Sequence, residues 1–223
     1  MINHHKEFRN KETTTKSNKI RKESNNKTIN WSSKAIVCID APHGGSDTGQ
    51  YDGTNYEKTQ MLSLADSVKN ELESAGVTVV MTRTDTSVDY TKRIEICNNA
   101  KAAALVSFHR DITDKSGSSK GISAWIHTSS PSNSKSLASD IMEELNGVDV
   151  SLSGVNTGTP DNKSKDYYLN QHSKVASCII ELGNMYSSKD NKLVTTDIDN
   201  TAKLIADGIM KYLEQAGYTN GSN

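Results

Sequence analysis

The sequence predicts one α/β domain, a mostly parallel sheet of about six strands flanked by helices on both faces. Short apolar runs rich in β-branched residues alternate along the chain with amphipathic segments of helical period, which is typical of βαβ units. The apolar runs lack polar alternation, as expected for strands buried on both faces. The 223 residues fit one domain of ordinary size.

The first βαβ unit spans residues 35–82. The run AIVCID at 35–40 predicts a buried strand that ends at an aspartate. From Glu57, apolar residues recur at intervals of three and four and stop near Gly76, which predicts an amphipathic helix with a glycine at its end. The run VTVVMT at 77–82 predicts the second strand. Strand, crossover helix and strand together form the unit.

The middle of the chain continues the alternation. A helical pattern at 90–99 precedes the buried strand 104–109. The segment 121–127 alternates between apolar and polar residues, as a strand does. Apolar residues on one face predict a helix over 134–145.

The last part of the domain begins with a glycine-rich and proline-containing stretch at 147–166, which predicts loops. We expect a short strand at 167–170. The apolar run 175–181 predicts a strong strand that ends in a glutamate, and 198–213 predicts the closing helix.

The ends of the chain have a different composition from the domain. Residues 1–33 hold eight Lys or Arg and three Glu, a net charge of +5, with no apolar period. This composition predicts a disordered basic and polar tail. The domain then extends over 34–217, and 218–223 are expected to be a polar end or linker. Neither the tail nor the domain has a field strong enough to indicate nucleic-acid binding.

The three cysteines, Cys38, Cys97 and Cys178, are widely spaced and include no CxxC pair. Two of them lie inside apolar strand-like runs, so we expect buried free thiols rather than disulfides or metal ligands. Apolar runs of the roughly 20 residues needed to span a bilayer are absent from the sequence.

Ligand-capable side chains follow three of the predicted strands. His43 lies just past the first, His109 ends the third and Glu181 ends the last. In open α/β sheets, ligands bind beyond the carboxyl ends of the strands. If these strands are parallel, the three side chains meet at one edge, and Glu57 at the next helix start can reach it. Two histidines and a glutamate are a common ligand set of catalytic zinc, although the HGG turn alone could also bind phosphate.

Five ordered motifs then support a resemblance to a known family. They are IVCIDAPHGGSDTG, an EK pair opening a helix, GVTVVMTR, LVSFHRD and CIIELGNMYSSKDNKLV. In this order they resemble the zinc-dependent N-acetylmuramoyl-L-alanine amidases of the Amidase_3 family, of the endolysin and autolysin type, from about Ala35 to Gly217. The resemblance implies hydrolysis of the amide between N-acetylmuramic acid and L-alanine in bacterial peptidoglycan, in cell-wall lysis or remodelling.

The resemblance also implies roles for individual residues. His43, Glu57 and His109 look like the ligands of one zinc ion. Glu181 looks like the catalytic glutamate that moves the proton of the attacking water. Two positions depart from the family pattern: Pro42 stands where a glycine is usual, and Asp111 where many members have asparagine.

Three further residues are candidate substrate contacts: Asp111, Asn184 and Arg83. Asp111 could instead support the metal ligands from outside, and for Arg83 a structural ion pair or loop anchor is the expected role, with substrate contact as the alternative.

Peptidoglycan is the expected partner, with no nucleic acid and no membrane, and we expect a monomer. The N-terminus lacks the apolar region of a signal peptide. We therefore expect synthesis in the cytoplasm and action at the cell wall after release, as for a phage lysin, or as part of a longer exported protein. The alternatives are a zinc peptidase or deacetylase acting on another cell-wall substrate, and a non-catalytic wall-binding module.

Overall fold

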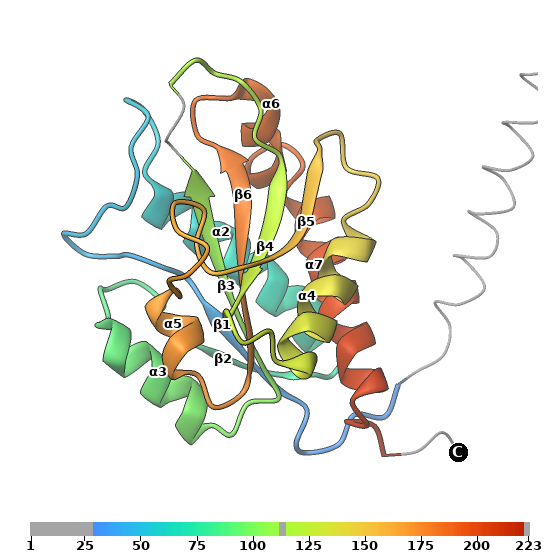
Figure 1. Ribbon diagram of the computed structural model, residues 1–223. Helices are drawn as coiled ribbons and strands as arrows, with labels where there is room; N and C mark the ends of the chain where they lie inside the picture. Colours follow the sequence, from blue (N-terminus) through green and yellow to red (C-terminus); the bar gives the residue numbers. More distant parts are fainter. Residues whose placement is uncertain (1–28, 112–114, 221–223) are drawn as a thin grey trace, which may run out of the picture.

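A computed structural model describes residues 29–111 and 115–220 and shows the predicted α/β architecture (Figure 1). Six strands form one sheet in the order β2-β1-β3-β6-β4-β5. The strands are β1 (Ile36–Asp40), β2 (Thr78–Met81), β3 (Ala104–Asp111), β4 (Ile122–Ile126), β5 (Leu152–Thr157) and β6 (Ala176–Asn184). The first four in sheet order are parallel, and β4 and β5 run in the opposite direction.

Helices cover both faces of the sheet, as the sequence predicts. The helices are α2 (Glu57–Ser74), α3 (Tyr90–Asn99), α4 (Ser132–Glu144), α5 (Tyr168–His172), α6 (Ser188–Asn191) and α7 (Ile198–Gln215), with a 3₁₀ turn at Lys192–Val194. Apolar residues of α2, α4 and α7 form the larger core with one sheet face. Side chains of α3 and α5 pack on the other face in a smaller core. Within the described residues, no helix is both long and apolar enough to span a bilayer.

The alternation of side chains along β3 and β6 places His109 and Glu181 on the sheet face that α3 and α5 cover. Leu105, Ile179 and Trp125 belong to the smaller core, and successive side chains of a strand point to opposite faces. His109 and Glu181 lie an even number of residues from Leu105 and Ile179, so they share this face. Their Cα atoms are partners in the ladder between β3 and β6.

Two element predictions in the last part of the chain are wrong. Residues 167–170 do not form a strand, because 168–172 form the short helix α5, in which the Asn170 side chain donates to the Trp125 carbonyl and accepts from the Ser177 hydroxyl. The first bond links α5 to β4, 45 residues away in the sequence, and the second links it to β6, seven residues further along the chain. Contacts with these two strands are not visible in the local pattern of 167–170. The sixth strand is instead β5, within the stretch predicted as loops. It lies at the sheet edge, is only half-buried and contains Gly154, so it lacks an apolar run.

Most of the predicted tail lies outside the residues that the structure describes. Residues 1–28 and 221–223 lie outside the described part of the chain. Residues 29–33, predicted as part of the tail, pack on the domain instead: the Trp31 indole donates to the Ala75 carbonyl at 2.9 Å, and Trp31 pairs with Thr219 in a β-bridge. Backbone hydrogen bonds from Ser32 to the Tyr218 carbonyl and from Asn220 to the Asn30 carbonyl also anchor this segment.

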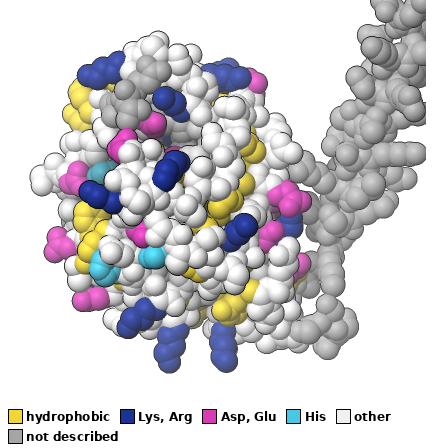
Figure 2. Space-filling view, viewed as in Figure 1, with side chains coloured by type: hydrophobic (Ala, Val, Ile, Leu, Met, Phe, Trp, Pro, Cys, Tyr) yellow, Lys and Arg dark blue, Asp and Glu magenta, His cyan; other side chains and the backbone are white. Residues whose placement is uncertain are grey.

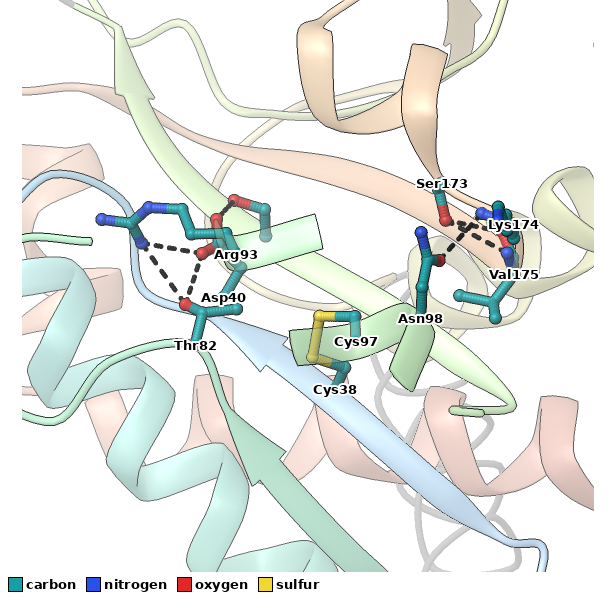
Figure 3. The surroundings of a disulfide bond; sticks show 10 residues. Cys38, Asp40, Thr82, Arg93, Cys97, Asn98, Ser173, Lys174 and Val175 are labelled. Atoms are coloured by element: carbon teal, nitrogen blue, oxygen red, sulfur yellow. Dashed lines mark hydrogen bonds and ion pairs between the residues drawn. A yellow bond between two sulfur atoms is a disulfide. The ribbon is translucent and has the colours of Figure 1, made fainter. Parts of the chain in front are cut away.

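The prediction of three free thiols is wrong for two of them. Cys38 of β1 and Cys97 of α3 form a disulfide, with Cα atoms 5.5 Å apart (Figure 3). Both side chains point into the smaller core, between strand and helix. Their sequence separation of 59 positions hides this proximity in the sequence. Cys178 is free and buried, as predicted, and burial raises its thiol pKa.

Candidate active site

The loop after β1 holds His43 in a backbone conformation that few residues adopt. The φ of His43 is +60°, in the left-handed region, where a residue other than glycine is strained and persists only if its surroundings hold it. Two buried arginines do so: Arg93 donates to the His43 carbonyl at 2.6 Å, and Arg83 donates to the Pro42 carbonyl at 2.9 Å. The position of the imidazole is therefore set by tertiary contacts of its own backbone.

A buried polar network anchors Arg93 itself. Its guanidinium forms an ion pair with Asp40 at 2.8 Å. The Thr82 and Ser107 hydroxyls donate to the two carboxylate oxygens of Asp40 at 2.5 and 2.6 Å. Figure 3 shows Arg93, Asp40 and Thr82 close to the disulfide of Cys97, which lies one helical turn after Arg93. The ends of β1, β2 and β3 and the start of α3 are thus joined beneath the His43 loop.

Glu57, the first residue of α2, lies at the centre of the site. Its side chain is buried, and its oxygens accept backbone N–H groups of Gln50 at 2.9 Å and Arg110 at 3.0 Å. The same carboxylate lies 3.2 Å from His43 Nε2 and 3.1 Å from His109 Nδ1. These four contacts fix the carboxylate between the two imidazoles.

The protonation equilibria of the three groups are coupled. Burial disfavours the charged form of each group, but the hydrogen bonds between the groups favour it more strongly. Despite its burial, the hydrogen bond and charge of Glu57 raise the pKa of His109 to about 9, and the same contacts raise the pKa of His43. Despite burial, the hydrogen bonds of the two histidines lower the pKa of Glu57 far below its ordinary value. The site therefore stabilises a carboxylate beside positive charge.

These three side chains fit a metal ion. Each offers a ligand atom, and the three atoms lie within 4.8 Å of one another. Two imidazoles and one carboxylate, with room for water, are the ligand set of a catalytic zinc site. Asp47 accepts a hydrogen bond from His43 Nδ1 at 2.9 Å, the outer contact that orients metal-binding histidines.

Gly49 is the glycine that the cluster requires. Its φ is +62°, and a Cβ atom there would lie 2.5 Å from the His43 ring and 2.8 Å from a Glu57 oxygen. A side chain at this position would occupy the space that the ligands need.

Glu181 faces the cluster from the neighbouring strand, opposite His109. Its carboxylate accepts a hydrogen bond from the Tyr167 hydroxyl at 2.5 Å. Burial raises the pKa of Glu181, while His109 and the Tyr167 hydroxyl oppose the shift. A carboxyl group with a raised pKa is a stronger base than an ordinary carboxylate, which suits a group that must accept a proton and then return it.

The structure separates the three predicted substrate contacts. Asp111 lines a cavity of about 260 Å³ together with Glu181. Asn184 is fully buried and is not among the lining residues of this cavity, and its amide donates to the Ser118 carbonyl. Arg83 is buried and donates to the carbonyls of Ala41, Pro42 and Lys58, so it anchors the loop, which is the role that the sequence favours over substrate contact.

Sequence reasoning missed the residues that position the site. Tyr167 was assigned to a strand, and Arg93 and Arg110 were not singled out. Arg110 is buried beside the ligands and donates to Gln60 and to the Asn184 carbonyl. One signal in the sequence could have identified Arg110. It directly follows the candidate ligand His109 at the end of a predicted buried strand, and an arginine is buried only where it has partners.

Cavities open on both sides of the His43–Glu57–His109 cluster. One of about 400 Å³ lies against His43, between Asp47 and the start of α3, and includes Tyr90 and Tyr168. The 260 Å³ cavity lies on the other side, over β6, β4 and β5. On the face shown in Figure 2, histidines lie on the left among acidic and hydrophobic side chains, and basic side chains are spread over the surface.

Comparison with known proteins identifies relatives of this site and fold. The profile of the Amidase_3 family, described as N-acetylmuramoyl-L-alanine amidase, matches residues 37–211. The uncharacterized protein YqiI of Bacillus subtilis is 29% identical over 183 residues, which cover 80% of this chain and 85% of YqiI. The N-acetylmuramoyl-L-alanine amidase LytC of the same organism is 27% identical over 79% of this chain, but the match spans only 35% of LytC.

Solved structures show the same fold. The catalytic domain of CwlV, an N-acetylmuramoyl-L-alanine amidase from Bacillus (Paenibacillus) polymyxa var. colistinus, is 27% identical and superimposes with a TM-score of 0.70. The match covers 80% of this chain and 98% of that domain. The similarity therefore extends over a whole catalytic domain.

Proposed function

The chain belongs to the Amidase_3 family of N-acetylmuramoyl-L-alanine amidases, and from this premise we propose that its site cleaves peptidoglycan with one zinc ion. The bond is the amide between the lactyl group of N-acetylmuramic acid and the first L-alanine of the stem peptide. The observation that supports this most is the His43–Glu57–His109 cluster with Glu181 opposite it on the adjacent strand.

The roles of the protein groups follow from their positions. His43, Glu57 and His109 would hold the ion, with Asp47 and the backbone N–H groups around Glu57 keeping the ligands oriented. When bound, zinc supplies a Lewis acid that polarises the carbonyl and lowers the pKa of water from about 15.7 toward 7.

Glu181 carries the proton. It accepts the proton of the attacking water and passes it to the alanine nitrogen as the amide breaks, a contribution of roughly 10²–10⁴-fold in rate. The raised pKa of Glu181 suits both steps. The Tyr167 hydroxyl holds the carboxylate on the side of the cluster where the leaving nitrogen must be.

The enzyme acts at the cell wall, where its substrate is. The Cys38–Cys97 disulfide supports this location, because disulfides persist in oxidising compartments and are rare in the reducing cytosol.

Digestion of purified sacculi tests the proposal. We expect release of soluble fragments, new N-terminal alanine on the peptides, loss of activity with a chelator and recovery with zinc. The His109→Ala variant should lose both bound metal and activity. Cleavage at another peptide bond would indicate a peptidase, and release of acetate would indicate a deacetylase. Wall binding without release of fragments would indicate a non-catalytic module.

A further inference from the structure

The two cavities beside the cluster lie in a fixed order along the sheet edge. Strand order places β1, β3 and β6 side by side, so His43, His109 and Glu181 follow one another in this direction. The cavity with Tyr90 and Tyr168 adjoins His43 at one end of this row. The 260 Å³ cavity begins at Glu181 and continues over β4 and β5. A substrate bound across the cluster therefore extends into both.

The reaction decides which part of the substrate lies on which side. Glu181 returns a proton to the alanine nitrogen, and proton transfer requires hydrogen-bond reach. The nitrogen that leaves belongs to the stem peptide, so the peptide lies on the Glu181 side of the scissile bond. The lactyl group and its sugar lie on the His43 side, toward the exposed aromatic rings of Tyr90 and Tyr168.

The cavity at Glu181 is lined by charged side chains of both signs. Asp111 and Glu181 are its acidic groups, and its two cationic groups are Lys120 before β4 and Lys163 in the loop after β5, which are therefore the groups that can bind a carboxylate. The Lys163 ammonium lies 3.7 Å from the centre of the Trp125 ring, a cation–π contact that holds it at the cavity wall. The second residue of the stem, a glutamate joined through its γ-carboxyl, carries a free α-carboxylate unless it is amidated. At about 3.5 Å per residue, that carboxylate lies within roughly 7 Å of the scissile bond.

We propose that this cavity is the stem-peptide subsite and that Lys120 and Lys163 bind the α-carboxylate of the second stem residue. The inference rests on the amidase function proposed above. Binding of this carboxylate by the two lysines makes the enzyme selective for walls in which the carboxyl is free over walls in which it is amidated.

Two soluble substrates test the subsite: muramyl tripeptide amides, MurNAc-L-Ala-γ-D-Glu-L-Lys-NH₂, with the D-Glu α-carboxyl free or amidated. We expect the native enzyme to cleave the free acid with a kcat/KM about two- to thirty-fold higher, the range for two partly exposed ion pairs. In the Lys120→Gln/Lys163→Gln double variant this ratio should fall to about one, mainly through KM. Lys163→Arg, combined with native Lys120, should preserve the preference.

The control is Lys135→Gln, an exposed lysine of α4 outside both cavities, which should leave the ratio and the activity unchanged. Equal rates on the two substrates for the native enzyme, or a ratio that survives in the double variant, would overturn the subsite while leaving the amidase function intact. Failure to cleave either substrate or intact sacculi at the lactyl–alanine bond would instead refute the proposed function.

Discussion

Removal of the Cys38–Cys97 disulfide is expected to destabilise the protein by about 4 kcal/mol. The bond closes a loop of 59 residues, and the loss of chain entropy on closing a loop of this length corresponds to about 4 kcal/mol at 25 °C. Loss of the disulfide should also affect the site. The bond joins β1 to α3, and Arg93 of α3 contacts Asp40 and the His43 carbonyl.

The assay is urea unfolding of the native protein and of the Cys38→Ala/Cys97→Ala double variant, followed by circular dichroism. The matched control is Cys178→Ala, which changes a buried thiol that forms no disulfide and so measures the effect of truncation alone. Titration of the unfolded native protein should find one reactive thiol without reductant and three after reduction. Three thiols before reduction, or a double variant no less stable than the Cys178 control, would refute the reasoning.

Three further outcomes concern the site. Gly49→Ala should weaken metal binding by at least about tenfold, because its Cβ would lie 2.5 Å from the His43 ring; bound zinc measured by mass spectrometry checks this, and full occupancy would contradict it. Glu181→Gln should retain the metal but lose about 10²–10⁴-fold in kcat on sacculi, and normal turnover would remove Glu181 from the mechanism. Tyr167→Phe removes the hydroxyl that lowers the raised pKa of Glu181. Since the proton acceptor must be ionised, activity is lost as pH falls through this pKa, so the acidic limb of the pH–rate profile should move to higher pH in Tyr167→Phe. A limb that stays in place would show that Glu181 does not control it.

The sequence determined the local features of the fold. Apolar runs such as 104–109 and 175–181 have the length and composition of buried strands. The spacing of apolar residues by three and four from Glu57 onward identifies α2. The polar residues that end these runs were therefore recognisable as groups at the sheet edge. Because the period of a pattern is a property of neighbouring residues, one sequence suffices to show it.

Only the tertiary structure decided which remote segments meet. It placed Glu181 opposite His109, reversed β4 and β5 relative to the other strands, paired Cys38 with Cys97 and held the strained His43 backbone with Arg93. It also made 168–172 a helix, which is joined to β4 and β6 by the hydrogen bonds of Asn170. The physical reason is that these arrangements depend on the free energy of the whole packed domain, to which each local segment contributes only part.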